Sequence, residues 1–382
     1  MGRYSIRNYN FLLVAVSAAL SVYGIIIIGS AKESVQSHQI QGLILGLGVM
    51  LVISLISYKF LLKFGWFYYA LAVGLLLMVK LFGEVVNNAK RWLVVAGIQL
   101  QPSEAAKILL ILFLAAFISK REDRINRAPV LIAIMGLMAV PVYLILDEPD
   151  LSTSIVVMFI FVGMLYVGGL SYRIIGGVAA VAIPIVIIGI FLVLQPDQEI
   201  IEPYQQTRIL AWLQPEKYQD TAGYQQQNSI VAIGSGMLTG KGYKTNEVGS
   251  VKNGNFISEP QTDFIMAVAG EELGFAGCVL MVALFALATA LVIHTGRKAT
   301  ELSGTLICAG VAAHIGFQSF ANIGVATGLL PNTGLPLPFI SYGSTSLISL
   351  LAEIGLVLNV GLMSVEGRQV SSLSFHIDRD LL

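Results

Sequence analysis

The segment FISEPQTDFI, at residues 256–265, is where a long polar stretch ends and a long apolar run begins. Pro260 suits the first turn of a helix, because the N–H that proline lacks is not needed there. Ser258 and Thr262 are residue types that cap the N-termini of helices. We therefore expect Asp263 in the first turn of a membrane helix, near the boundary between water and hydrocarbon.

The local sequence gives Asp263 two interpretations. A charge at the edge of hydrocarbon is costly, so it marks a candidate functional site. A carboxylate at the positive end of a helix dipole also stabilises that helix without any further role, and this is the commoner case. Glu271, about two turns deeper in the same run, faces away from Asp263, so the two carboxylates do not form a glycosidase-type pair.

The composition predicts a membrane protein. Of the 382 residues, 56% are hydrophobic and 12% are charged, and the mean hydropathy is +0.78. Apolar runs of about 20 residues recur along the chain, and each is long enough to span hydrocarbon as a helix. The formal net charge is zero and no basic tract is present, so the sequence lacks the usual signature of a protein that binds nucleic acid. Cys278 and Cys308 lie in apolar runs without disulfide or metal-site spacing, so we interpret them as packing residues.

The predicted fold class is an all-α polytopic membrane protein, in which residues 1–382 form one transmembrane domain. Lys and Arg concentrate in one set of short loops, and the positive-inside rule places those loops and both termini in the cytoplasm. Residues 195–261 then form a large extracytoplasmic loop between the seventh and eighth spans. The ten predicted spans are residues 11–29, 40–57, 65–83, 103–119, 129–146, 151–170, 174–194, 262–293, 303–329 and 339–364.

The first outer loop carries Arg91 and Trp92. Such a pair commonly anchors a protein at the membrane interface, although the guanidinium geometry also suits a phosphate. Glu104 and Lys107 follow at the start of the fourth span, three residues apart on one helical face. They are either a local ion pair or part of a ligand site, and an ion pair inside a membrane segment still needs a reason to exist.

The large loop is too long to be a simple connection. Apolar and polar residues alternate at 204–213 and again near 229–237, as in helices that lie on a membrane surface. The glycine-rich segment 234–243 carries Lys241. Its backbone amides and this lysine are either a phosphate cradle or a tight turn. The lysines of this loop make it basic near Asp263, and such a field favours an anionic ligand.

The last three spans carry further polar and small residues. His314 in the ninth span is interpreted as a satisfied packing residue, and Glu353 in the tenth as an unpaired membrane acid. Prolines and glycines at 328–343 would break a spanning helix, which predicts a re-entrant or interfacial loop that lines a protein cavity. The small residues that predict close helix packing along the eighth span are Gly270, Gly274 and Gly277.

Three sequence blocks stand out: AKRW at 89–92 with QPSE at 101–104 and Lys107, TDFI at 262–265 with GEELG at 270–274, and GLLP at 328–331 with GLPLPFISYG at 334–343. These blocks resemble the SEDS family of bacterial cell-wall proteins, which comprises the RodA, FtsW and SpoVE groups. The order and spacing of the blocks and the ten-span layout extend this resemblance over the whole chain. The short termini and Gly-Lys-Gly at 240–242 resemble the RodA group most.

The resemblance implies a peptidoglycan glycosyltransferase of the bacterial cytoplasmic membrane, which polymerises lipid II into glycan strands for cell elongation and rod shape. By the same resemblance, Asp263 is the base that takes a proton from the attacking sugar hydroxyl while undecaprenyl pyrophosphate leaves. Arg91, Lys107 and Lys241 are candidates for contacting the pyrophosphate. The other candidate substrate-binding residues are Trp92, Glu104, Glu259, Thr262 and Ser341.

The resemblance implies no certain cofactor, and a divalent cation, Mg²⁺ or Mn²⁺, is the one candidate. It also implies lipid II, a transpeptidase of the class B penicillin-binding type and other cell-elongation proteins as partners. The sequence departs from the family pattern before Asp263, where residues 257–261 lack the usual Leu-Pro-Glu and histidine. Asn88 replaces a usual glycine, and residues 344–346 replace part of a usual Gly-Gly-Ser-Ser run.

Other functions compete with this prediction. A lipid flippase or transporter would use the acids and lysine inside the spans as a path across the membrane. A non-catalytic scaffold for a transpeptidase, or a division or sporulation role within the family, is also open. Polar residues gather on one membrane face, which favours the glycosyltransferase, because a transporter needs a site open to both sides. We also expect an apolar groove that reaches Asp263 from the lipid. The residues of the alternative path are Glu104, Lys107, Glu271, Glu272 and Glu353.

Overall fold

The computed structural model describes residues 8–86, 89–95, 98–195, 203–245, 249–250, 253–254 and 256–364. Within these residues, nine helices are long and apolar enough to cross a membrane, and Leu151–Val167 is a shorter apolar helix. The predicted all-α membrane fold is therefore confirmed. These nine helices and the shorter one, α7, are α1 (Phe11–Ala31), α2 (Gln36–Leu55), α4 (Gly65–Phe82), α5 (Pro102–Ser119), α6 (Ala128–Asp147), α7 (Leu151–Val167), α8 (Tyr172–Val193), α12 (Ile265–Arg297), α13 (Leu302–Ala326) and α14 (Ser344–Leu362).

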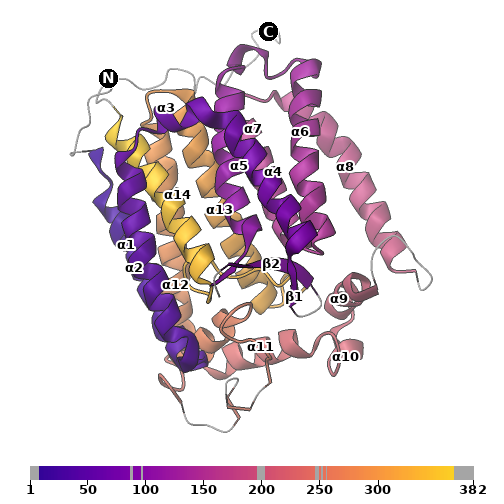
Figure 1. The fold of residues 1–382 in the computed structure, drawn as a ribbon. Helices are drawn as coiled ribbons and strands as arrows, with labels where there is room; N and C mark the ends of the chain where they lie inside the picture. The colour runs from indigo at the N-terminus through magenta and orange to yellow at the C-terminus, as the bar shows by residue number, and fades with distance from the viewer. Residues whose placement is uncertain are drawn as a thin grey trace, which may run out of the picture.

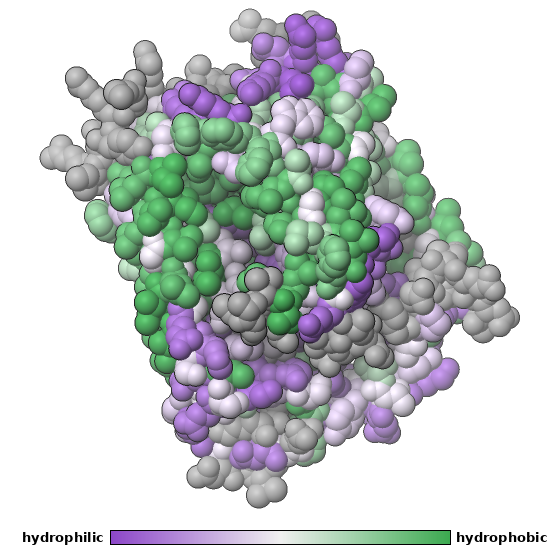
Figure 2. Space-filling view, in the orientation of Figure 1, coloured by the Kyte–Doolittle hydropathy of each residue, from purple (hydrophilic) through white to green (hydrophobic). Residues whose placement is uncertain are grey.

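The long helices stand side by side as a bundle, with α9 (Pro203–Leu213), α10 (Pro215–Tyr218) and α11 (Tyr224–Ser235) lying across one end (Figure 1). The α1 and α14 ends nearest the chain termini lie together at the opposite end of the bundle (Figure 1). A green apolar band separates more polar ends in the space-filling view (Figure 2). This distribution is typical of a protein whose middle faces hydrocarbon.

The core of the bundle is built around α5, α13 and α14, of which most residues are buried. Helix α14 packs along α2, and α13 packs against α5, α7 and α12. In contrast, the described side chains of α8 are mostly exposed or half-buried, and Val193 at its end is the one that is buried. The short helix α3 (Tyr58–Leu61) connects α2 to α4.

The first outer loop forms a small antiparallel sheet that the sequence did not predict. Strand β2 (Ala89–Val95) pairs with β1 (Glu84–Val86) on one side and with β3 (Ile98–Leu100) on the other. These strands are short and lie between two spans, so the alternation of apolar and polar residues is too brief to predict them. The sheet places Arg91 and Trp92 next to each other on β2, and the pairing register sets Trp92 opposite Glu84 of β1.

Helix α12 is broken rather than continuous. Gly274 has φ 64° and ψ −163°, which interrupts the helical path within Ile265–Arg297. The prediction of one smooth stripe of close packing through Gly270, Gly274 and Gly277 is therefore wrong at its middle position. A break in a membrane helix leaves backbone groups without helical partners, and these must be satisfied by protein.

The glycine-rich segment of the large loop provides hydrogen-bond partners for the backbone groups at the break in α12. The N–H groups of Phe275 and Ala276 donate to the carbonyls of Met237 and Leu238, at 2.8 and 3.1 Å. In return, the carbonyls of Glu271 and Glu272 accept from the N–H groups of Lys241 and Gly242, at 2.9 and 3.1 Å. The segment is thus neither a phosphate cradle nor a plain tight turn, because its amides complete the interrupted helix.

Candidate active site

The backbone around Asp263 is clamped by two other elements. Asn322 on α13 donates from Nδ2 to the carbonyl of Asp263 at 2.8 Å and to the carbonyl of Leu335 at 2.6 Å. The hydroxyl of Ser341 donates to the carbonyl of Thr262 at 2.5 Å. One amide and one hydroxyl therefore join the segment before α12 to the loop between α13 and α14.

The loop between α13 and α14 is non-helical, as predicted for residues 328–343, and its stretch 337–341 is buried. Its backbone groups are satisfied by side chains. Gln39 on α2 donates to the carbonyl of Ser341 at 3.2 Å and accepts from the N–H of Gly343 at 3.0 Å. This satisfaction by protein is the condition under which irregular backbone is tolerated at membrane depth.

The Asp263 side chain is half-buried beside this loop. A Cβ on Gly334 would lie 3.3 Å from Oδ2 of Asp263, so the loop backbone passes directly over the carboxylate. Gly334 has φ 73°, a conformation that side chains other than glycine rarely adopt. Among the residues that the structure describes, the Asp263 carboxylate has no hydrogen bond or ion pair, so it is available to a ligand.

Burial raises the pKa of Asp263 from 3.8 to about 6. The positive charges of Arg208 and Arg91 oppose this rise, and the negative charges of Asp150 and Glu259 add to it. The expected position in the first helical turn is wrong, because the turn at 260–264 precedes α12, which begins at Ile265. Desolvation therefore outweighs any stabilisation of the carboxylate by the helix dipole.

Arg91 lies close to the acidic turn after α6. Its Nε donates to the carbonyl of Glu148 at 3.1 Å, and its guanidinium also donates to the carbonyl of Pro149. Oδ2 of Asp150 is 3.9 Å from the same Nε, while Oδ1 accepts from the N–H of Thr153 and caps α7. Burial and the neighbouring Asp150 charge raise the pKa of Glu148 to about 8, against the pull of Arg91.

Arg208 is a site residue that the sequence did not identify. It lies on α9, which confirms the predicted surface helix of the large loop, and its Nη1 donates to the carbonyl of Asn332 at 3.5 Å. It is also the first of the two cations that act on Asp263. The sequence signal was an arginine among amphipathic residues, which does not distinguish it from a surface charge.

Glu104 and Lys107 form the local ion pair that was one of two alternatives. Nζ of Lys107 is 2.7 Å from Oε1 of Glu104, and the two side chains are 4% and 1% exposed. Ser346 donates to Oε2 of Glu104, and Lys107 also donates to Gln318. Because both charges are buried and paired with each other, neither is placed to contact a pyrophosphate.

Lys241 also fails as a pyrophosphate ligand. Its Nζ pairs with Oε1 of Glu271 at 2.9 Å, within the segment that completes α12. Glu272 accepts from the hydroxyl of Ser30 at 2.5 Å. The acids of this span are thus engaged by side chains of the protein rather than lined up as a path.

Of the remaining predicted site residues, three lie close to Asp263 in the chain or in space, and Trp92 lies in the sheet. Glu259 is exposed, lies 3.8 Å from Nζ of Lys32 and acts on Asp263 by its charge. Thr262 and Ser341 hold backbone beside Asp263, whereas Trp92 is half-buried in the sheet opposite Glu84. The structure therefore gathers Arg91, Glu259, Thr262 and Ser341 around Asp263 and places Glu104, Lys107 and Lys241 in other clusters.

Glu353 is not an unpaired acid, which corrects the sequence prediction. Its Oε2 lies 2.8 Å from Nδ1 of His314, and both residues are fully buried between α13 and α14. His314 is satisfied, as predicted, but by hydrogen bonds rather than by apolar packing. The hydropathy pattern could not pair these residues because they are 39 positions apart.

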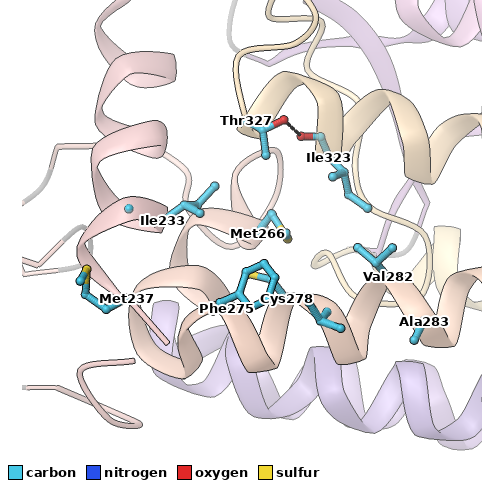
Figure 3. Close-up of a pocket in the computed structure, with 11 residues that line it drawn as sticks. Ile233, Met237, Met266, Phe275, Cys278, Val282, Ala283, Ile323 and Thr327 are labelled. Carbon is cyan, nitrogen blue, oxygen red and sulfur yellow. Dashed lines mark hydrogen bonds between the residues drawn. The ribbon is translucent and has the colours of Figure 1, made fainter. Parts of the chain in front are cut away.

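An apolar cavity of about 630 Å³ lies between α11, α12 and α13. Ile233, Met266 and Phe275 point into it, and Thr327 stands at its edge (Figure 3). Its size and apolar lining fit a hydrocarbon chain. Met266 is three residues from Asp263, but Asp263 itself does not line the cavity, so the predicted groove that connects the lipid with Asp263 stays a prediction.

Comparison with known proteins decides the family. The FTSW_RODA_SPOVE family model, described as "Cell cycle protein", matches residues 6–365. The chain belongs to this family. The SEDS peptidoglycan glycosyltransferase MrdB of Escherichia coli K12 is 34% identical over 352 residues, covering 91% of this chain and 92% of its own. A Geobacter sulfurreducens SEDS relative, named "Probable peptidoglycan glycosyltransferase FtsW", is 32% identical over 375 residues, covering 93% of this chain and 95% of its own.

Solved SEDS structures share the fold. A chain of a peptidoglycan synthase complex that coordinates polymerization and crosslinking matches with a TM-score of 0.77 at 32% identity, covering 92% of this chain and 97% of that chain. The rod shape determining protein RodA of Thermus thermophilus matches with a TM-score of 0.68 at 29% identity, covering 92% and 96%. The resemblance to this family, and to its RodA group, is confirmed.

Proposed function

We propose that this chain is a peptidoglycan glycosyltransferase that polymerises lipid II at the outer face of the bacterial cytoplasmic membrane, in cell elongation. The observation that carries the proposal is the Asp263 carboxylate, which is half-buried, lies in the electrostatic field of Arg208 and Arg91, and has no partner among the described residues. It lies in a chain whose E. coli relative is a peptidoglycan glycosyltransferase. The termini then lie in the cytoplasm, and residues 195–261 lie outside.

Asp263 acts as the general base in this mechanism. The attacking sugar hydroxyl gives its proton to the carboxylate while its oxygen forms a bond with the anomeric carbon of the second lipid II. The bond between that carbon and the pyrophosphate oxygen breaks, and the pyrophosphate leaves with the electron pair. A base with a pKa of about 6 is largely ionised near neutral pH and still accepts a proton readily.

Arg91 and Arg208 stabilise the departing pyrophosphate. They are the two cations whose charges act on Asp263, so an anion beside that carboxylate lies in the field of both. Guanidinium groups bind phosphate oxygens in a bidentate manner, and such charge-assisted bonds are stronger than neutral ones. Lys107 and Lys241 have no part in this step, because each is engaged with a glutamate.

The described residues offer the predicted divalent cation no cluster of ligands. Among the residues that the structure describes, no group of three or more His, Cys, Asp or Glu side chains could bind a metal ion. The protein groups thus do not fit a resident ion, and the proton and pyrophosphate steps are derived without one. A cation that arrives with the pyrophosphate stays a proposal.

A transpeptidase of the class B penicillin-binding type is the proposed partner. The similar synthase complex couples polymerization with crosslinking, and crosslinking is the reaction of a transpeptidase. A flippase is disfavoured because the charges inside the spans are paired in closed clusters, at Glu104 with Lys107, Glu271 with Lys241, and Glu353 with His314. A transport path needs groups that open to both sides.

Reconstitution tests the enzyme against the flippase. Vesicles that contain the chain, its transpeptidase partner and labelled lipid II are expected to produce glycan chains, which are resolved by gel electrophoresis. Translocation is measured in parallel by protection of the label from an added hydrolase. Translocation without glycan chains from a folded preparation would contradict the glycosyltransferase proposal.

Arg208→Ala is expected to lower kcat/KM for lipid II by about 10- to 100-fold, because it removes a charged hydrogen-bond donor worth about 1.5 to 3 kcal/mol. It also removes a cation that holds down the pKa of Asp263, so the acidic limb of the pH profile should move to higher pH. Arg208→Lys should recover part of the loss and the original limb. Lys217→Ala, on the neighbouring α10, is the matched control. An acidic limb that does not move in Arg208→Ala would show that Arg208 is not part of the site.

A further inference from the structure

A chain of buried polar side chains crosses the bundle from α14 through α13 to α5. Nδ1 of His314 lies 2.8 and 3.0 Å from the two carboxylate oxygens of Glu353, and Nε2 lies 3.0 Å from Oε1 of Gln318. The same Oε1 accepts from Nζ of Lys107 at 3.0 Å, and Lys107 pairs with Glu104. A cluster of this size inside a membrane segment is costly unless every member is satisfied.

The hydrogen bonds fix where the protons are. An ammonium group only donates, so the Gln318 atom that faces Lys107 is the oxygen, and the amide orientation is set. His314 must then carry a proton on Nε2 to donate to that oxygen. Nδ1 faces the carboxyl group of Glu353, and one proton lies between them whichever atom holds it. The pair is neutral in either form, as is Glu104 with Lys107, so the whole cluster is neutral.

The amide of Gln318 connects this cluster to the loop beside Asp263. Nε2 of Gln318 donates to the carbonyl of Pro336 at 2.9 Å, and Asn322, one turn further on α13, donates to the carbonyl of Leu335. Two consecutive loop carbonyls are therefore taken by two side chains of one helix face. Gly334, the next residue back along the loop, is the one that covers the Asp263 carboxylate.

We propose that His314 and Glu353 are positioning residues for glycosyl transfer, which fix Gln318 so that the loop at 331–343 is held over Asp263. This inference rests on the proposed role of Asp263 as the base. His314 supplies a second hydrogen bond, beside that of Lys107, to Oε1 of Gln318, and Glu353 holds the imidazole of His314 in place for that bond. The active-site geometry thus depends on a pair on the far side of α13.

The cluster does not act as a proton path from the site. Its connection to Asp263 runs through the amide of Gln318, the loop backbone and the amide of Asn322, and the last bond ends on the carbonyl of Asp263. None of these bonds reaches the carboxylate oxygens that take the sugar proton. His314 contacts Glu353 from α14 and Gln318 from its own helix, and the charged groups nearest to this pair are Lys107, which also donates to Gln318, and Glu104, both from α5. Ser346 of α14 donates to Glu104.

The test uses the double variant His314→Leu/Glu353→Leu, which removes the pair without leaving a buried charge and so preserves folding. We expect kcat for lipid II polymerisation to fall about 10- to 100-fold with KM changed less than about threefold, because a shift of about 1 Å at a reacting group has this effect. A looser loop admits water to Asp263, so the acidic limb of the kcat/KM profile should move below about pH 6.

Glu353→Gln is the conservative variant. Its amide donates to Nδ1 of a neutral His314, which leaves the Nε2 proton on Gln318, so most of the wild-type kcat and the original acidic limb should be recovered. Adding Gln318→Leu to the double variant should cause little further loss, because the pair acts through Gln318. His294→Leu, an exposed histidine change on α12, is the matched control.

Three results would overturn the inference: wild-type kcat in the double variant, a uniform loss of activity at every pH with the limb unmoved, or an additive loss with Gln318→Leu. A failure of the base assignment is distinguished by Asp263→Asn. If Asp263→Asn stays active, the proposed role of Asp263 is wrong; if it is inactive while the double variant is normal, only the positioning role is wrong.

Discussion

Asp263→Asn is expected to lower lipid II polymerisation by about 10² to 10⁴-fold, the range in which a positioned general base contributes to catalysis. The substitution keeps the size and the half-buried surroundings of the side chain and removes only its capacity to take the sugar proton. The measurement is the initial rate of glycan chain formation by the reconstituted chain with its partner. Asp220→Asn, an exposed carboxylate of the same large loop, is the matched control and should behave as the wild type.

The pH dependence gives this prediction a second readout. The base must be ionised, and the pKa of Asp263 is raised from 3.8 to about 6, so kcat/KM should rise with pH through about 6 and level off above it. Residual activity of Asp263→Asn should lack this limb. An acidic limb near pH 4 in the wild type would show that burial does not act on the working base.

Stability should change in the opposite direction from activity. The folded-state pKa of Asp263 lies above its unfolded value, so between about pH 4 and pH 6 folding loses stability as the pH rises, and the cost persists at higher pH. Asparagine removes this cost. The thermal midpoint of Asp263→Asn at pH 7.5 is therefore expected to equal or exceed that of the wild type, and a fall would point to a structural role for the carboxylate.

The membrane architecture follows from the sequence because hydrocarbon imposes simple rules. Apolar length predicted the spans, and the positive charges predicted termini on one side, since lipid requires internally bonded helices. The small sheet at β1 to β3 escaped prediction because its strands are only three to seven residues long and lie between two spans. The break at Gly274 also escaped, because the apolar run resumes directly after it and the compensating partner is about 35 residues earlier in the chain.

The active site could be predicted only in part. Asp263 was identified by its place at the start of an apolar run and by resemblance, and Arg91 by its place in a predicted outer loop. Arg208 and Asp150 were not identified, because their closeness to Asp263 comes from the packing of separate loops. Glu104, Lys107 and Lys241 looked like ligands because a sequence shows charge but does not show which charges are already paired.

Gly274→Ala is expected to destabilise the chain strongly and to abolish polymerisation. Gly274 occupies a backbone region that is essentially confined to glycine, where another residue costs about 1 to 3 kcal/mol. A Cβ there would lie 2.4 Å from the N of Gly240 and 2.8 Å from the carbonyl of Leu238, which are backbone atoms that have little freedom to withdraw. The measurements are the thermal midpoint in detergent and the polymerisation rate in vesicles.

The effect on activity has a structural cause of its own. The part of α12 before the break follows directly from Asp263, and the segment at 237–242 holds that part by two backbone hydrogen bonds, to the carbonyls of Glu271 and Glu272. Displacing the segment therefore moves the start of α12 and the carboxylate with it. Gly48→Ala provides the control, because a Cβ at this helical glycine of α2 meets no atom within 4 Å. A Gly274→Ala variant that melts and polymerises like Gly48→Ala would mean that the break in α12 is not required for the position of Asp263.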